Sequence, residues 1–278
     1  MNEHHVKADS LLDKKVNNLE QILGEDWQVS PAGGATGEAY IAEYGNQKLF
    51  LKRNSSPFLA VLSAEGIVPK LLWTKRLGNG DVITAQQWLD GRELKAADMK
   101  SENVAKLLAK IHRSQELLGM MNRLEKKKLT PLDLLNDIQL QMRKEKDYLE
   151  IINDSFAYLM ETASEVEVDN LVVCHCDVNH NNWLLSDSNE LFLIDWDGAM
   201  IADPALDLGM LLYSYIPYED WEEWLGIYGE TLNDHLERRM HWYVLAQTIS
   251  SFFWYKEKGQ SKETARFAES IKELAGAI

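Results

Sequence analysis

Hydrophobic and polar positions change their spacing once along the chain, near residue 90. Up to residue 25 the chain is polar, with a weak apolar stripe at helical spacing that predicts an N-terminal helix. Four short runs follow at 27–29, 39–44, 48–52 and 82–84, with turns at 45–46 and 78–80. Their alternation or β-favouring composition predicts a small antiparallel sheet within residues 27–90.

From residue 96 onward, apolar residues recur at helical spacing. Val104, Leu108 and Ile111 share one face of a predicted helix that ends near His112. Two amphipathic helices are predicted over 132–159, and an aromatic-rich helical segment over 221–274. Between them, apolar runs at 171–173 and 191–194 bracket a polar loop.

This pattern predicts an α+β fold with two lobes. The N-terminal lobe, residues 1–90, contains the first helix and the antiparallel sheet. The C-terminal lobe, residues 91–278, is mainly helical. A cleft between two lobes is a natural place for a ligand.

Composition narrows the possible partners. The 278 residues include 29 basic and 44 acidic side chains, a net charge of −15, which argues against nucleic acid and weakly favours neutral or cationic small molecules. No apolar run approaches the roughly 20 residues that span a bilayer, and the polar N-terminus lacks a secretory signal. Cys174 and Cys176 are too close for an unstrained disulfide. These features predict a cytoplasmic protein without a membrane partner.

The densest polar cluster follows the two central apolar runs. Asp177, Asn182 and Asp195 offer only oxygen ligands, which suit magnesium beside phosphate rather than zinc. The alternative is that these are ordinary turn residues, because Asp and Asn favour turns. Two acidic residues placed directly after predicted buried strands favour a metal or phosphoryl site.

The same residues resemble known motifs. His175-x-Asp177-x4-Asn182 resembles the catalytic loop of the protein-kinase superfamily, in the form found in aminoglycoside phosphotransferases and choline kinases. Residues 194–197 resemble the family's metal-binding Asp-Phe-Gly element, and 203–208 resemble the motif that follows it. The helix end at His112 is similar to the family's Leu-Ala-x-Leu-His. The resemblance covers about residues 31–255 and implies a protein-kinase-like two-lobe fold.

The resemblance implies a role for each matching residue. Asp177 would be the catalytic base, and Asn182 and Asp195 would hold Mg²⁺ ions that bridge the phosphates of ATP. His175 and Asp207 would support the catalytic loop, whereas Asp197 would either help to hold metal or substrate or cap the next segment. His180 is expected to face solvent, with contact to the substrate as the alternative. Cys176 stands where the family often has glycine, and is either a small buried filler or a redox-sensitive thiol.

In the N-terminal lobe the resemblance implies a nucleotide site. Lys52 would contact the α and β phosphates with Glu65 as its carboxylate partner, although a lone strand lysine is usually a solvated edge residue. A glycine run would cover the phosphates, although by itself it is equally an ordinary hairpin turn. The linker backbone would contact adenine. The glycine run comprises Gly33, Gly34, Thr36 and Gly37, and the linker Gln86, Gln87, Trp88 and Leu89.

The implied function is ATP- and Mg²⁺-dependent phosphoryl transfer to a hydroxyl of a small molecule, such as an amino-alcohol like choline, an aminoglycoside or a sugar. The aromatic residues of 221–255 form either a box for a cationic acceptor or ordinary core. The alternative is a nucleotide-binding pseudokinase acting as a regulator or partner-binding module. A protein acceptor is disfavoured because 195–203 is short for an activation segment. The sequence leaves open the acceptor, ATP versus GTP, and the oligomeric state.

Overall fold

The computed structural model describes residues 19–276 except Gln21, Glu25, 34–37 and Lys146. Most of the predicted N-terminal helix therefore lies outside the described residues. The chain divides into two compact units. The first is Met1–Arg92 together with Leu185–Phe192, and the second is Glu93–Leu184 with Leu193–Ile278. The chain thus returns briefly to the first unit between two segments of the second.

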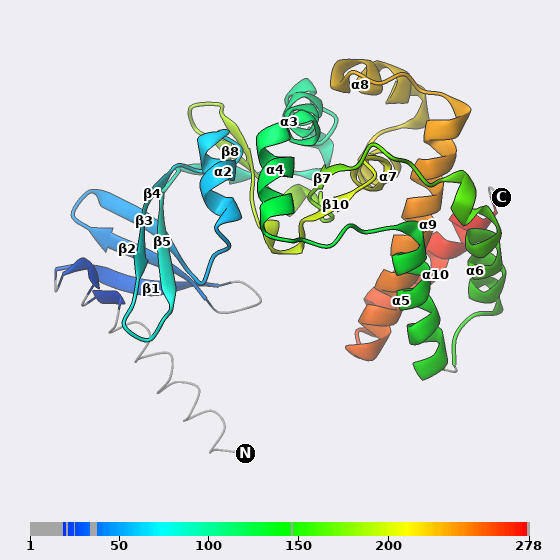
Figure 1. The fold of residues 1–278 in the computed structure, drawn as a ribbon, viewed down its shortest axis with the longest axis horizontal. Helices are drawn as coiled ribbons and strands as arrows, with labels where there is room; N and C mark the ends of the chain where they lie inside the picture. Colours follow the sequence, from blue (N-terminus) through cyan, green and yellow to red (C-terminus); the bar gives the residue numbers. More distant parts are fainter. Residues whose placement is uncertain (1–18, 21, 25, 34–37, 146, 277–278) are drawn as a thin grey trace. The chain divides into compact units, whose positions relative to one another are not determined.

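The first unit is built on a five-stranded antiparallel sheet in the order β1-β2-β3-β5-β4 (Figure 1). Its strands are β1 (Gln28–Gly33), β2 (Ala39–Tyr44), β3 (Gln47–Arg53), β4 (Leu71–Arg76) and β5 (Val82–Gln87). The sequence pattern missed β4, because its side chains are mostly exposed and show no buried face with apolar alternation. The short helix α2 (Phe58–Ala64) follows β3.

Side-chain alternation gives this sheet two faces. On one face Tyr40, Leu51 and Ile83 are fully buried and pack with Leu19 in one apolar cluster. The other face carries Lys52, which pairs in register with Thr84. The alternation that buries Leu51 therefore turns Lys52 away from the apolar cluster.

The second unit is mainly helical. Its helices are α3 (Glu102–Arg113), α4 (Gln115–Arg123), α5 (Pro131–Lys144), α6 (Glu150–Thr162), α7 (Ala205–Tyr215), α8 (Trp221–Tyr228), α9 (Asp234–Glu257) and α10 (Ser261–Ala275). Figure 1 shows the long α9 beside α5 and α10, and α7 also packs on α9. Gly209 of α7 permits that packing, because a Cβ there would lie 2.8 Å from the carbonyl oxygen of Met240.

Short strands carry the polar loops. β7 (Val172–Cys174) pairs antiparallel with β10 (Met200–Ala202). A three-stranded sheet has the order β6 (Gly91–Glu93), β8 (Trp183–Ser186), β9 (Leu191–Leu193). Single 3₁₀ turns at His180–Asn182 and Trp196–Gly198 follow β7 and β9, so each of these strands leads into polar residues.

The predicted α+β class is confirmed: an antiparallel sheet precedes a mainly helical region, as in protein-kinase-like folds. The aromatic segment is helical and most of its rings belong to the core, including Trp221, Trp224, Trp242 and Phe253. Trp254, half exposed, is an exception. Within the described part of the chain, no helix is both long and apolar enough to cross a membrane.

Candidate active site

Asp207, in the first turn of α7, holds the loop that follows β7. Its fully buried carboxylate accepts hydrogen bonds from the backbone N–H groups of His175 (2.7 Å) and Cys176 (2.9 Å). Burial alone would raise the pKa of Asp207, but the hydrogen bond and charge of His112, with the nearby His175, bring it below its ordinary value. The carboxylate is therefore ionised at neutral pH, and the expected supporting role of Asp207 is confirmed.

His112, at the end of α3, links Asp207 to α8. Its Nε2 lies 3.1 Å from the Asp207 carboxylate and its Nδ1 lies 2.7 Å from the Tyr228 hydroxyl. An ionised carboxylate only accepts hydrogen bonds, so Nε2 carries the proton. Burial raises the pKa of Tyr228, so its hydroxyl stays protonated and forms a hydrogen bond with Nδ1. The chain of hydrogen bonds joins three helices beneath the loop.

His112, Cys174 and Asp207 place ligand-type atoms within 4.8 Å of one another. Hydrogen bonds account for these groups without a metal. The Cys174 thiol donates to the carbonyl of Asp203 at 3.4 Å, and burial raises the pKa of Cys174, which keeps it in the thiol form. A thiol is a poor metal ligand compared with a thiolate. The cluster is structural.

His175 fastens the loop to the end of β9. Its Nε2 donates to the carbonyl of Ile194 at 2.8 Å, so Nδ1 is free to accept the backbone N–H of Asp177 at 3.3 Å. The imidazole packs edge-to-face on Trp196, with ring centroids 4.8 Å apart. Both ring nitrogens are thus used for support, as expected.

Hydrogen bonds connect the chain segments that carry three predicted site residues. The Asn182 side chain donates from Nδ2 to the carbonyl of Asp177 at 2.9 Å, which leaves its Oδ1 as an available ligand. The N–H of Ile194 donates to the Asn182 carbonyl at 2.8 Å, and Asp195 follows directly. The Asp177 and Asp195 carboxylates belong to exposed residues. One amide oxygen and two carboxylates are hard oxygen donors of the kind that Mg²⁺ prefers.

Two residues of this junction have left-handed backbones although they are not glycine. Cys176 has φ of +66° and Asp195 has φ of +64°. Strained conformations of this kind cluster at functional sites. A positive φ favours glycine, which is the residue that the family resemblance implies at the Cys176 position. Cys176 is itself largely buried, and burial raises its pKa well above the ordinary value.

In the first unit, Lys52 and Gln86 lie on the sheet face opposite the apolar cluster. Thr84 of β5 pairs in register with Lys52, and its hydroxyl donates to the Lys52 carbonyl at 3.1 Å. The buried Gln86 side chain donates to the carbonyl of Pro69 at 2.8 Å, which gives that side chain a structural bond. Glu65 is the half-buried C-cap residue of α2.

Hydrogen bonds and a cation–π contact hold the segment that begins at the end of β5. The Gln87 N–H donates a hydrogen bond to the backbone carbonyl of Lys70. Trp88 donates its indole N–H to the Asp90 carboxylate, and the Lys48 ammonium lies over the Trp88 ring, 4.1 Å from its centroid. Leu89 is half-buried. Gly33, at the end of β1, has φ of +84°. Predicted residues Gly34, Thr36 and Gly37 lie outside the described residues.

Two features escaped the sequence analysis. A Cβ on Gly91 would overlap the carbonyl oxygen of Leu185, so the chain can pass there only as glycine. His180 was expected to face solvent; it is half-buried, and its Nδ1 lies 3.1 Å from the hydroxyl of Tyr215. No local signal marks Tyr215, because it is separated from His180 by the whole of β8, β9, β10 and α7.

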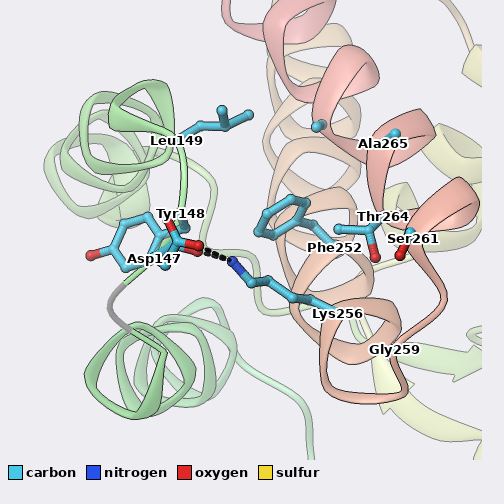
Figure 2. Close-up of a pocket in the computed structure, with 10 residues that line it drawn as sticks. Asp147, Tyr148, Leu149, Phe252, Lys256, Gly259, Ser261, Thr264 and Ala265 are labelled. Carbon is cyan, nitrogen blue, oxygen red and sulfur yellow. Dashed lines mark hydrogen bonds and ion pairs between the residues drawn. The ribbon is translucent and has the colours of Figure 1, made fainter.

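A cavity of about 420 Å³ lies elsewhere in the second unit, between residues 147–149 and the helices α9 and α10 (Figure 2). No predicted site residue lines it. Figure 2 shows the Lys256 ammonium paired with Asp147, 3.7 Å from its carboxylate, and Lys256 also lies 3.9 Å from Glu145. The charged groups lining it are thus already paired with each other.

Sequence comparison gives one family. The family described as "Phosphotransferase enzyme family" (APH) matches residues 28–243, which include every motif discussed above.

Solved structures with the same fold include small-molecule kinases. The choline kinase LicA from Streptococcus pneumoniae is similar with a TM-score of 0.72 and 17% identity, over 98% of this chain and all of that one. A choline/ethanolamine kinase family protein from Mesorhizobium loti gives 0.69 and 15%, over 96% and 94%. Spectinomycin phosphotransferase APH(9)-Ia, complexed with ADP and spectinomycin, gives 0.63 and 16%, over 90% and 92%.

Proposed function

The chain belongs to the phosphotransferase enzyme family, and from this we propose that it transfers the γ-phosphate of ATP to a hydroxyl group of a small molecule. The observation that carries the proposal is the junction of Asp177, Asn182 and Asp195. Hydrogen bonds through the Asp177 and Asn182 carbonyls tie these residues together, and Asp207 and His175 support them from below.

In this proposal Asp177 accepts a hydrogen bond from the acceptor hydroxyl and takes its proton as the oxygen attacks phosphorus. The bond from phosphorus to the β–γ bridging oxygen breaks, and ADP leaves with the electron pair. A loose transition state needs little help from a base early on, so alignment of the hydroxyl accounts for most of the role of Asp177.

Asn182 and Asp195 would hold Mg²⁺, since their oxygens fit it. When bound, Mg²⁺ neutralises charge on the transferring phosphoryl group. In the first unit, Lys52 would contact the α and β phosphates, with Glu65 as its partner. Residues 33–37 would supply backbone N–H groups to phosphate, and residues 86–89 would contact adenine.

A cationic acceptor is favoured. The net charge of −15 attracts cations, and proteins of the same fold carry the names of choline, ethanolamine and spectinomycin kinases. Because most aromatic residues of 221–255 are buried in the core, acidic side chains are the better candidates for recognising a cation. The pseudokinase alternative is disfavoured because Lys52, Asp177, Asn182 and Asp195 are all intact.

The test compares Asp177→Asn with Asp187→Asn, which makes the same charge change at an exposed turn residue. Phosphoryl transfer from Mg²⁺-ATP is measured with choline, ethanolamine, spectinomycin and kanamycin as acceptors, and ATP binding by thermal shift. We expect Asp177→Asn to lose about 10²–10⁴-fold in rate and keep its ATP-induced shift. Asp187→Asn should match the wild type.

Two results would count against the proposal. Undiminished turnover by Asp177→Asn would remove the assignment of the base. An ATP-induced shift in the wild type without transfer to any acceptor, at any Mg²⁺ concentration, would support the pseudokinase instead.

A further inference from the structure

Tyr215, the last residue of α7, lies against the loop between Asp177 and Asn182. Its hydroxyl oxygen is 3.2 Å from the backbone nitrogen of His180, 3.1 Å from His180 Nδ1 and 3.3 Å from Asn179 Oδ1. The His180 and Tyr215 rings also meet edge-to-face, with centroids 5.7 Å apart. One phenol therefore contacts two consecutive loop residues through three polar atoms.

The three contacts match what a phenol can do. A hydroxyl donates one hydrogen bond and accepts two. The His180 N–H can only donate and Asn179 Oδ1 can only accept, so the hydroxyl donates to Asn179 and accepts from His180. His180 Nδ1 then carries its proton and supplies the second donated bond. The Tyr215 hydroxyl is thus saturated by this loop.

The electrostatics keep Tyr215 in the form this arrangement requires. Burial raises the pKa of Tyr215, and the charge of Asp177 raises it further. The hydroxyl therefore keeps its proton across the neutral range.

Helix α7 thus holds the loop at two points. Asp207 in its first turn binds the N–H groups of His175 and Cys176, and Tyr215 at its end binds Asn179 and His180. The two side chains are separated by roughly 12 Å of helix axis at 1.5 Å per residue. Asp177 lies in sequence between the two attachment points.

We propose that Tyr215 is a positioning residue for phosphoryl transfer, which sets the loop from Asp177 to Asn182 through its hydroxyl. The effect reaches Asn182 because the Asn182 N–H donates to the carbonyl of Asn179 at 2.9 Å. This inference rests on the proposed function, in which Asp177 and Asn182 are the base and a metal ligand. The proposal does not require Tyr215 to contact the acceptor.

The test is Tyr215→Phe, with Tyr213→Phe as the matched control. Tyr213 is on the same helix and packs on Trp221, with ring centroids 4.8 Å apart. Its variant removes one phenol oxygen, as Tyr215→Phe does. We expect Tyr215→Phe to lower kcat about 10- to 100-fold and to raise the Mg²⁺ concentration for half-maximal rate about 10-fold. KM for ATP and the melting temperature should change little. Tyr213→Phe should stay within twofold of the wild type.

Further readouts separate positioning from general stability. His180→Ala should lower kcat. The double variant should lose less kcat than the product of the two single losses, because both substitutions act on one contact. Amide hydrogen exchange of residues 177–182 should quicken in Tyr215→Phe and not in Tyr213→Phe. The inference is overturned if the two tyrosine variants behave alike, or if kcat falls only in proportion to lost folded protein.

Failure of the proposed function would look different. A wild type that transfers no phosphate, or an active Asp177→Asn, removes that function whatever the tyrosine variants do. Hydrogen exchange still decides whether Tyr215 holds the loop, because it needs no turnover.

Discussion

Cys176 and Asp195 adopt left-handed backbone conformations that cost a non-glycine residue roughly 1–2 kcal/mol each. At Cys176 the cost is offset by the Asp207 carboxylate, which binds the N–H of that residue and of His175. The backbone turn there directs the chain from β7 toward Asp177. The strain is therefore a consequence of placing a polar loop directly at the end of a buried strand.

The strain at Cys176 predicts that glycine gives a more stable protein than alanine at this position, the reverse of the usual order. Both Cys176→Gly and Cys176→Ala remove the thiol, but only glycine relaxes a φ of +66°. We expect the glycine variant to be the more stable by roughly 1 kcal/mol, whereas alanine is normally favoured over glycine. Urea unfolding of the two proteins measures the difference. An alanine variant that equals or exceeds the glycine variant in stability would show that the backbone is unstrained.

At the scale of elements, α7 is the organising helix. It packs on α9 through Gly209, binds α3 through Asp207 and His112, and holds the loop after β7 at both of its ends. Its position decides where the proposed base lies. Because α7 makes contacts on several sides, few of its residues are exposed, and Leu206, Leu208 and Leu211 are all fully buried.

Helix α5 shows a simpler determinant, a side-chain cap at its start. Thr130 accepts a hydrogen bond from the N–H of Asp133, and the Asp133 carboxylate accepts from the Thr130 N–H at 3.0 Å. The hydrogen bond from Lys127, and those from Thr130, lower the pKa of Asp133 from 3.8 to about 2. Pro131 at the first helical position suits the same geometry.

This cap predicts a pH dependence with a definite sign. Because the folded pKa of Asp133 is depressed, its stabilising effect is complete well above pH 3.8 and is lost as pH falls toward 2. Asp133→Asn should therefore destabilise the protein by about 1 kcal/mol near pH 7 and progressively less below pH 4. Unfolding free energies at several pH values measure this. Asp137→Asn, an exposed change on the same helix, is the control, and a pH-independent difference would contradict the cap.

At the scale of the whole molecule, the net charge of −15 is the dominant electrostatic property. It creates a field that concentrates small cations near the surface and repels anions. With the proposed substrates, Mg²⁺-ATP and an ammonium-bearing acceptor, this field would favour binding of the acceptor.

Ionic strength should therefore affect a cationic acceptor through binding. Screening shortens the range of the field to about 8 Å at 0.15 M salt and about 3 Å at 1 M. We expect KM for choline or spectinomycin to rise several-fold between these salt concentrations, with a smaller change in kcat. A neutral sugar acceptor assayed in parallel is the control. Equal salt sensitivity of neutral and cationic acceptors would contradict field-assisted binding.

Much of the molecule was predictable because its cause is local. Alternation over 39–44 and 48–52 predicted β2 and β3, and helical spacing predicted α3, α5 and α6. The order of polar residues around Asp177, Asn182 and Asp195 indicated a metal or phosphoryl site, their resemblance to known motifs implied a phosphotransferase, and the family match agrees with this. Residue type and spacing are sufficient for such conclusions, since hydrogen bonding within a helix or strand and the chemistry of a short motif involve near neighbours.

Other features depended on which distant segments pack together. Spacing alone left the aromatic residues of 221–255 as either a cation box or core, and packing placed most of them in the core. The same holds for His180, which meets Tyr215 only once α7 has docked, and for His112, whose partners come from α7 and α8. By itself the sequence determined many of the elements, the motif and the family. Tertiary structure alone decided the contacts that His112, Tyr215 and Tyr228 contribute to the support of the loop, because those hydrogen bonds join groups that no local pattern relates.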